Sequence, residues 1–471
     1  MIHKYRLFSD NIVLDVNSSA VYVFDDISYE LLGAWSDDAG AFSRAAEAEV
    51  ARRRGEAETR EAREEIESLI SSGQLFSEAS PEAELAGIER TFVFKSLCLH
   101  MAHDCNMRCA YCFASAGSFG AERGLMPFET ARRAIDFVAG ASGSRRNIEI
   151  DFFGGEPLLN FETVKKTVAY ARGIEGKAGK RFRFTLTTNG TLLDGEAAAF
   201  ANEHMDNLVL SIDGRREVND AVRKTAGGGG TYDAIVPRFR DVVAGRGGKS
   251  YYMRGTYTAR NADFASDVLH LADLGFDQIS VEPVVAPGDP SLALERGRLP
   301  ELLREYERLA LAMRRREERG EGFNFFHFMV DMEGGPCAAR RLKGCGAGYE
   351  YAAVTPDGSI YPCHQFAGNA RFRLGDVFGG IGALRTVREF QDANVYAKPK
   401  CRACWAKYFC GGGCAASAYQ SSGGAGISEP DEFYCALLKK RVECAIWLRY
   451  ARDGGWESRE SQGGQGDGAE D

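Results

Sequence analysis

The spacing of the cysteines constrains this chain more than any other feature of its sequence. The chain has thirteen cysteines: Cys98 comes first, Cys105, Cys109 and Cys112 form one group, and nine more extend from Cys337 to Cys444. The first residues lack the long apolar run of a signal peptide, so we expect a cytoplasmic protein. In a reducing compartment, clustered cysteines indicate metal binding or redox chemistry more often than disulfides. We therefore expect these groups to bind metal or to do redox work.

Length and charge limit the class of protein. The chain has 471 residues, too many for one ordinary domain, and 44% of them are apolar, enough for a hydrophobic core. It has no stretch of roughly 18–20 unbroken apolar residues, so we expect no membrane span. The net charge is −9, and the acidic ends (residues 1–90 at −10, residues 454–471 at −4) argue against nucleic-acid binding. The middle, at about +5, suits an anionic small molecule or an acidic peptide.

Residues 1–80 are expected to form a small separate unit of strands followed by helices, the size of a winged-helix module. Its expected strands are Tyr5–Phe8, Ile12–Val16 and Val21–Phe24, and its expected helical segments are Ile27–Trp35 and Phe42–Ser71. The composition of Ser77–Glu89 is typical of a linker, and that of residues 454–471 is typical of a disordered tail.

Residues 91–320 alternate short apolar runs with helical segments, which predicts six βα units and a parallel sheet. The expected strands are Phe92–Met101, Ile148–Phe153, Phe182–Thr188, Leu208–Ile212, Tyr251–Tyr257 and Gln278–Pro283. The expected helices are Phe128–Ala139, Phe161–Arg172, Glu196–Glu203, Tyr232–Val243, Ala262–Leu274 and Leu299–Arg319. No G-x-G-x-x-G follows the first strand, so an α/β fold with a partial (β/α)6 barrel is favoured over a dinucleotide-binding sheet. The apolar runs predict that both faces of the sheet are covered, and the chemistry is expected at the carboxyl ends of the strands.

The first cysteine group follows the first barrel strand with the spacing C-x3-C-x2-C. Three thiolates this close on one loop can hold three corners of a [4Fe–4S] cluster. No fourth cysteine is near, so one iron would be free to chelate a ligand. A zinc loop with a distant fourth ligand is the alternative.

With an aromatic residue before its last cysteine, this motif resembles the signature of radical S-adenosylmethionine (SAM) enzymes. The resemblance implies that the open iron binds SAM and that reduction of the cluster cleaves SAM to methionine and a 5′-deoxyadenosyl radical. The segments 154–157 (GGEP), 187–191 and 211–214, each after a later strand, resemble further motifs of the family. The SAM contacts that the resemblance implies are Gly154, Gly155, Glu156, Asn189, Ser211, Asp213 and Arg254. Glu156 is expected to receive the SAM ammonium, and Arg254 to pair with the SAM carboxylate.

Residues 321–450 form a loop-rich segment that we expect to need bound metal for its stability. Its cysteines have the spacing C-x12-G-x4-C, then C-x2-C-x5-C-x3-C and a final cysteine. This spacing resembles the SPASM extension of radical SAM enzymes that modify peptides, which holds two auxiliary [4Fe–4S] clusters. The implied inner ligands are Cys345, Cys363 and Cys414, with Cys337 as the candidate fourth, and the implied outer ligands are Cys401, Cys404, Cys410 and Cys435. Without Cys337, an open iron could take a substrate thiolate. Taken alone, Cys401 and Cys404 could begin a zinc ribbon. Cys98 lies on an apolar strand pattern and Cys444 on an apolar helix pattern, and both are interpreted as buried packing residues.

The N-terminal unit resembles the precursor-recognition module of peptide-maturing enzymes, a winged helix whose strand edge pairs with a leader peptide. A small structural cap is the alternative. The first 26 residues and the segment YPCHQF at 361–366 resemble one subgroup, the maturases of small Cys-rich SCIFF peptides, which form thioether links. Sulfatase maturases carry an acidic base directly after the cysteine that corresponds to Cys363, whereas this chain has His364, a candidate base or a hydrogen-bonded loop residue.

The resemblance implies a reaction in which hydrogen is removed from an acceptor residue, with threonine as the candidate, in a small Cys-rich precursor peptide. A substrate cysteine near the inner cluster then attacks the carbon, and a ferredoxin or flavodoxin supplies electrons in a cytoplasm low in oxygen. Two hypotheses stay open beside it: another SPASM modification (a carbon–carbon link or side-chain oxidation), and a non-catalytic peptide-binding protein stapled by zinc or clusters. Metal analysis separates the last, because three clusters carry about twelve irons.

Overall fold

The computed structural model describes residues 1–36, 40–78, 92–285, 288–330 and 342–452. The linker expected at Ser77–Glu89 and the tail expected at residues 454–471 lie almost wholly outside these ranges. No helix in the described ranges is long and apolar enough to cross a membrane.

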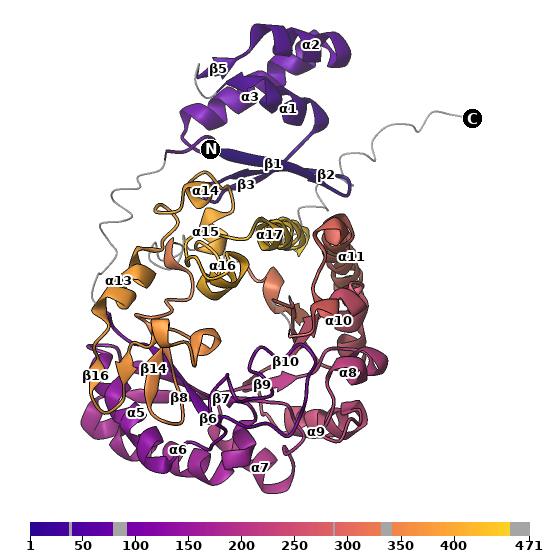
Figure 1. Cartoon of the computed structure of the whole chain (residues 1–471). Helices are drawn as coiled ribbons and strands as arrows, with labels where there is room; N and C mark the ends of the chain where they lie inside the picture. The colour runs from indigo at the N-terminus through magenta and orange to yellow at the C-terminus, as the bar shows by residue number, and fades with distance from the viewer. Residues whose placement is uncertain (37–39, 79–91, 286–287, 331–341, 453–471) are drawn as a thin grey trace.

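The first unit is a three-stranded antiparallel sheet followed by helices, drawn in indigo and violet in Figure 1. Its strands are β1 (Ile2–Leu7), β2 (Asp10–Asp15) and β3 (Val21–Phe24), and its other elements are α1 (Asp26–Leu31), β4 (Trp35–Ser36), β5 (Ala41–Phe42), α2 (Arg44–Arg54) and α3 (Glu56–Ser71). The single helical segment expected over 42–71 is wrong, because Gly55 takes a φ of +111° and separates α2 from α3.

The small sheet packs on both of its faces. Every residue of β2 is buried. Val13 packs with the helices of its own unit, whereas Ile12 and Leu14 belong to the core of the main body. The first unit is therefore joined to the rest of the molecule through a continuous apolar core.

The main sheet contains eleven strands of the described chain, in the order β12-β11-β10-β9-β8-β7-β6-β13-β14-β15-β16. Seven neighbouring described strands of this sheet pair in parallel: β6 (Ser96–Ala102), β7 (Asn147–Gly154), β8 (Arg181–Thr188), β9 (Asn207–Ser211), β10 (Ser250–Tyr257), β11 (Gln278–Pro283) and β12 (Asn324–Phe325). The helices between them are α5 (Phe128–Ala141), α6 (Phe161–Ala178), α7 (Gly195–His204), α8 (Arg216–Val222), α9 (Tyr232–Ala244), α10 (Phe264–Asp273) and α11 (Leu299–Glu318). The strand order is linear and the helices lie outside the curved sheet, which is the partial barrel that the sequence predicts (Figure 1).

The cover of the sheet differs between its strands: β6 is buried on both faces, whereas β8 is buried mainly on one face. On β8, Phe182 and Phe184 are fully buried, whereas Arg181 and Arg183 are exposed. The expectation that both faces are covered is therefore wrong for this strand. The side chains of β8 alternate because the inner face of the partial barrel is polar and open to water at this strand.

The C-terminal part extends the same sheet. The strands β13 (Tyr351–Val354), β14 (Ser359–Tyr361), β15 (Gly375–Asp376) and β16 (Gly380–Ile381) follow β6, and β13 pairs with β6 in parallel. The helices are α13 (Leu384–Asp392), α14 (Pro399–Arg402), α15 (Lys407–Cys410), α16 (Ala415–Ser421) and α17 (Glu432–Arg452).

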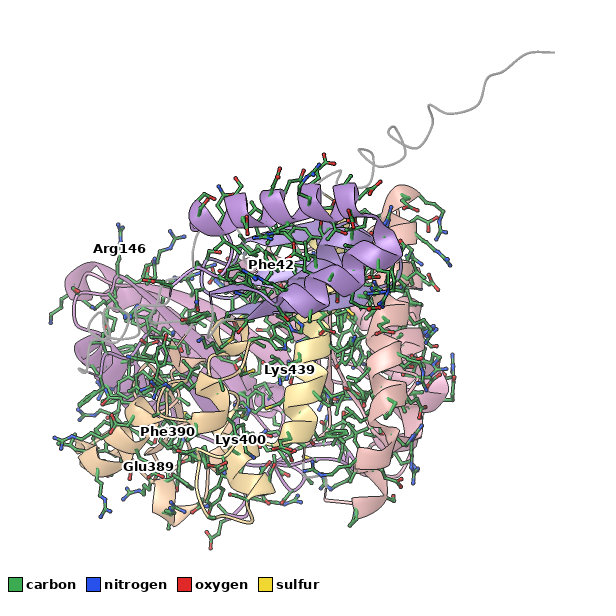
Figure 2. The ribbon with its side chains drawn as sticks, turned by 90° about the horizontal axis from the view of Figure 1, so that it is seen from above. Phe42, Arg146, Glu389, Phe390, Lys400 and Lys439 are labelled. Atoms are coloured by element: carbon green, nitrogen blue, oxygen red, sulfur yellow. The ribbon has the colours of Figure 1, made fainter. Side chains whose placement is uncertain are left out.

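The helix pattern around Cys444 is observed as the long helix α17, in a segment otherwise interpreted as loop-rich. It packs against α11 and against β1, and Figure 2 shows it beneath the helices of the first unit. Its residues 444–448 are buried without interruption. Because the helix is covered on several sides, such a run has no polar face, and the periodicity of the sequence does not show how far the helix extends.

Candidate functional site

The first cysteine group lies on the loop after β6, at the carboxyl end of the sheet. The backbone N–H of Met107 donates to the sulfur of Cys105 at 3.4 Å. Burial raises the pKa of the Cys109 thiol to about 12. A free thiol here would stay protonated, whereas a bound iron would hold it as a thiolate.

The glycine motif after β7 lies directly against this loop. A Cβ added to Gly155 would lie 2.0 Å from the carbonyl oxygen of Asp104, and one added to Gly154 would lie 2.5 Å from that of Ala102. The N–H of Glu156 donates to the Asp104 carbonyl at 3.0 Å. Only glycine permits this approach between the two loops.

The carboxylate of Glu156 is fully buried and accepts three hydrogen bonds from the protein. The donors are the hydroxyl of Thr188 at 2.7 Å, the N–H of Asn189 at 2.8 Å and the N–H of Leu158 at 3.1 Å. Burial raises the pKa of Glu156 to about 7 against the effect of these donors. In this structure the carboxylate joins the ends of β7 and β8, and a contact with SAM stays a prediction.

Asn189 brings the motif after β8 to the first cysteine group. Its amide nitrogen lies 3.7 Å from the sulfur of Cys105 and 2.9 Å from the side-chain oxygen of Asn106. Three segments expected at the same edge of the sheet therefore meet there in the structure.

Arg223, at the end of α8, was missed by the sequence analysis. It donates to the hydroxyl of Tyr111 at 2.8 Å, and Tyr111 in turn donates to the fully buried carboxylate of Asp213 at 2.8 Å. The charge of Arg223 acts on the thiols of Cys105 and Cys109, and its Nε is buried without a hydrogen-bond partner among the described residues. A buried guanidinium beside the thiols suits an anionic cluster and an anionic group of a cofactor.

Arg254 lies on the inner face of the sheet and forms an ion pair with Glu282 at 3.1 Å. The two side chains are 45% and 40% exposed, so they face water-accessible space. Burial tends to raise the pKa of Glu282, but the charges of Arg254 and neighbouring groups lower it to about 2. The guanidinium whose charge acts on the first thiols is that of Arg223, so pairing of Arg254 with the SAM carboxylate stays a prediction. Ser211 lies beside it, at the end of β9.

The expected inner ligands Cys345, Cys363 and Cys414 are brought close enough together for the charges of Cys345 and Cys414 to act on Cys363. One proline separates Cys363 from the end of β14, and Cys414 directly precedes α16. The candidate fourth ligand, Cys337, lies outside the described residues.

His364 connects the inner ligands to the first cysteine group. Its ring lies 5.5 Å, centroid to centroid, from that of Phe113, which directly follows Cys112. Its Nδ1 lies 3.2 Å from the hydroxyl of Tyr351. Burial, with the charge of Arg254, lowers the pKa of His364 to about 4, so the ring is neutral at pH 7.

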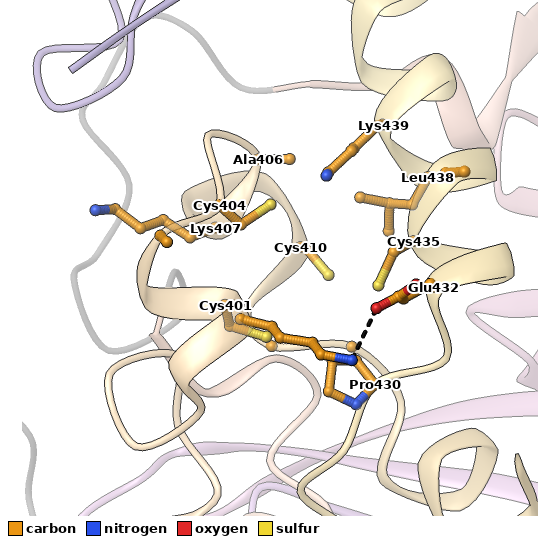
Figure 3. A pocket seen from close by; sticks show the side chains of 15 residues that line it. Cys401, Cys404, Ala406, Lys407, Cys410, Pro430, Glu432, Cys435, Leu438 and Lys439 are labelled. Carbon is orange, nitrogen blue, oxygen red and sulfur yellow. Dashed lines mark hydrogen bonds and ion pairs between the residues drawn. The ribbon is translucent and has the colours of Figure 1, made fainter.

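The expected outer ligands surround a cavity of about 430 Å³ between α14, α15 and α17. Figure 3 shows the sulfur atoms of Cys401, Cys404, Cys410 and Cys435 directed toward this space. No three described histidine, cysteine, aspartate or glutamate side chains are placed to hold one metal ion. Zinc needs its sulfur ligands at about 2.3 Å from a single point, so thiols spaced around a cavity fit a cluster of several irons better. Cys98 and Cys444 are fully buried, as expected for packing residues.

Two family models match this chain. Residues 99–249 match the radical SAM superfamily, and residues 345–405 match the SPASM iron–sulfur cluster-binding domain. The first match includes Cys105, Cys109 and Cys112, and the second includes two ligands of each expected auxiliary set.

Similar proteins include enzymes that modify peptides. The cysteine-type anaerobic sulfatase-maturating enzyme of Clostridium perfringens is 30% identical over 139 residues, which are 28% of this chain and 36% of that enzyme. The chain matches less than half the length of the curated relatives found first, 42% for one from Methanocaldococcus jannaschii.

Two solved structures have a similar fold. One is anSMEcpe with bound AdoMet and a peptide (TM-score 0.60, 21% identity, 76% of this chain and 99% of that one). The other is SuiB of Streptococcus suis bound to S-adenosylmethionine (TM-score 0.51, 16% identity, 90% of this chain and 96% of that one). The chain therefore contains a radical SAM domain followed by an iron–sulfur cluster-binding SPASM domain, whose cofactors are S-adenosylmethionine and [4Fe–4S] clusters.

Proposed function

We propose that this chain is a radical SAM maturase that installs Cys-derived thioether cross-links in a small Cys-rich precursor peptide. The observation that carries the proposal is the contact between Phe113 and His364, at 5.5 Å between ring centroids. These rings directly follow a ligand of the first group and a ligand of the inner group. A substrate residue beside them would reach both groups at once.

The protein's own residues have separate tasks in this reaction. When bound, SAM and the first cluster supply a radical that removes a hydrogen atom from the substrate. Cys105, Cys109 and Cys112 hold that cluster, and Cys345, Cys363 and Cys414 hold the inner one, with Cys337 as a candidate fourth ligand. Neutral His364, next to Cys363, can accept the proton of a substrate thiol. Each link formed removes two hydrogen atoms from the peptide: one is taken by the 5′-deoxyadenosyl radical, and the other leaves as the thiol proton and one electron, which the cluster held by the inner ligands would take up.

Residues 1–80 are proposed to recognise the precursor peptide. In the three-stranded sheet β3 is an edge strand, which can pair with an extended peptide. SuiB has also been solved bound to its precursor peptide SuiA, and that structure matches 89% of this chain with a TM-score of 0.50. Residues 92–471 are 380 of the 471 residues, which is less than 89% of the chain, so the matched region must include part of the first unit.

The proposed organisation is a recognition unit at 1–80, a radical SAM barrel at 91–320 and a SPASM domain with two auxiliary clusters at 321–450. The electron donor is proposed to be a ferredoxin or flavodoxin of the cytoplasm. A runner-up function, another SPASM modification of a peptide, is favoured by the match to TigE of Paramaledivibacter caminithermalis, a radical SAM cyclopropyl synthase that is 23% identical over 159 residues.

The test is the mass of the product made under anaerobic conditions. The iron-loaded chain, SAM and a reductant are incubated with the small Cys-rich peptide encoded beside it, free thiols are alkylated, and tandem mass spectrometry follows. Loss of two hydrogens per link, with cysteines that resist alkylation after reduction, supports thioether formation and locates the acceptor. If SAM is cleaved while every cysteine is still alkylated, the thioether proposal is wrong and the runner-up replaces it.

A further inference from the structure

Lys398 is a buried lysine that the proposed reaction does not use. Lys398 is 3% exposed and directly precedes α14. Its ammonium donates to the backbone carbonyl oxygen of Gly412 at 2.8 Å. No described carboxylate forms an ion pair with it.

A buried ammonium needs a counter-charge, because transfer of an unpaired charge out of water is costly. The groups that act on the charge of Lys398 are thiols of both auxiliary sets: Cys401, Cys410 and Cys435 of the outer set, and Cys414 of the inner set. Free thiols are uncharged and would leave the ammonium uncompensated. As iron ligands the same sulfur atoms are thiolates, and a [4Fe–4S] cluster with four of them is an anion.

We propose that Lys398 is the buried counter-charge shared by the two auxiliary clusters and that it favours their reduced states. The inference rests on the proposed cluster ligands. A cation near a cluster stabilises the added electron, and the effect is large where water does not screen it.

The hydrogen bond to Gly412 gives Lys398 a second, positioning role. Gly412 lies on the short loop between Cys410 of the outer set and Cys414 of the inner set. Its φ is +92°, and a Cβ there would lie 3.7 Å from the Lys398 ammonium. Lys398 therefore holds the loop that connects the two sets.

Three other lysines line the outer cavity and differ from Lys398 in exposure, direction or pairing. Lys407 is buried, but its ammonium lies over the rings of Tyr396 and Tyr408, 5.8 and 5.0 Å from their centroids, and Figure 3 shows it directed away from the cysteine sulfurs. Lys400 is 57% exposed and forms an ion pair with Glu432 at 2.8 Å. Lys439 is partly exposed and directs its ammonium into the cavity from α17 (Figure 3). Figure 2 shows Lys400 and Lys439 on the same side of the molecule. Water and Glu432 screen the charge of Lys400, which makes Lys400→Met a matched control on the same helix as the ligand Cys401.

The experiment measures reduction potentials, not product. The full chain carries Cys105→Ala, Cys109→Ala and Cys112→Ala so that only the auxiliary clusters load, and it is reconstituted with iron and sulfide without oxygen. Iron per chain is counted, and the clusters are titrated with reductant and followed by electron paramagnetic resonance. The variants added to this parent are Lys398→Met, Lys398→Arg and Lys400→Met.

We expect Lys398→Met to lower the ratio of reduced to oxidised auxiliary cluster about tenfold at a fixed potential, which is a midpoint shift of about 59 mV for one electron. Lys398→Arg and Lys400→Met should stay within threefold of the parent. A fully loaded Lys398→Met chain with the parent's midpoints would overturn the inference. If Lys398→Met loads less iron, retention of iron by Lys398→Arg supports a role for charge, and equal loss in both variants refutes it. A parent that binds no auxiliary iron would instead refute the proposed ligands.

Discussion

Replacing Gly155 with alanine tests whether the contact between the glycine motif and the first cysteine loop is as tight as the structure shows. The new Cβ would lie 2.0 Å from the carbonyl oxygen of Asp104, 2.5 Å from its carbonyl carbon and 3.0 Å from the Cα of Gly117. All three are backbone atoms, so no side chain can rotate away. The loops must separate by roughly 1 Å, as in an overpacked core.

The cost has two parts. Overpacking of this kind costs about 1–3 kcal/mol. Separation also breaks the 3.0 Å hydrogen bond from the Glu156 N–H to the Asp104 carbonyl. That loss adds ~1 kcal/mol. A total of about 2–4 kcal/mol predicts that the barrel unfolds at a temperature lower by roughly 4–16 °C.

Thermal unfolding of Gly155→Ala and the parent, together with iron content after anaerobic loading, measures the effect. Gly173→Ala is the matched control, because Gly173 lies in α6 with nothing within 4 Å of an added Cβ. Alanine there should raise the stability by about 0.5–1 kcal/mol. If the Gly155→Ala chain melts within about 2 °C of the parent and binds as much iron as the parent, the reasoning is refuted.

Three further outcomes are expected. Arg223→Met should weaken SAM binding to the iron-loaded chain about tenfold or more in equilibrium dialysis, and Arg254→Met should weaken it less; the reverse order would mean that Arg254 holds the carboxylate. Burial lowers the pKa of His327 well below its usual value. The neutral ring therefore stabilises the folded chain fully above about pH 6.5, and this contribution to the stability is lost as the pH is lowered. His327→Gln should therefore lose less melting temperature between about pH 7 and 5.5 than the parent, and an equal loss would contradict this assignment. Cys435→Ser should lower the iron content by about four of about twelve irons per chain, and unchanged iron would remove Cys435 from the outer set.

The strands of the barrel could be predicted from the sequence because they are short apolar runs between turns. The strand predicted at Gln278–Pro283 is observed with the same bounds as β11. A helix pattern was recognised around Cys444, but the length of α17 could not be predicted, because its residues 444–448 are buried without interruption and show no amphipathic periodicity. The break at Gly55 was missed because a single glycine in a run rich in alanine and glutamate only weakly opposes a helix.

The cysteine groups could be found from the sequence because the ligands of one cluster lie close together along the chain. The polar partners could not, because tertiary structure creates them. Arg223 meets Tyr111 across 112 residues, and Arg254 meets Glu282 between neighbouring strands. The buried Lys398 has no sequence signal either, because its environment depends on how the loop around Gly412 folds back.

Glu156 shows how a motif can be found correctly while its task is decided by the fold. Its carboxylate accepts from the N–H of Asn189 at 2.8 Å, and the amide of Asn189 lies 3.7 Å from the sulfur of Cys105. Its own N–H holds the carbonyl of Asp104, the residue before Cys105. Glu156 thus fixes the first cysteine loop from two sides, once through the backbone and once through Asn189. The position of the glycine motif directly after β7 is therefore explained by contact between two loops at the strand ends, in addition to the ligand that the motif is expected to bind.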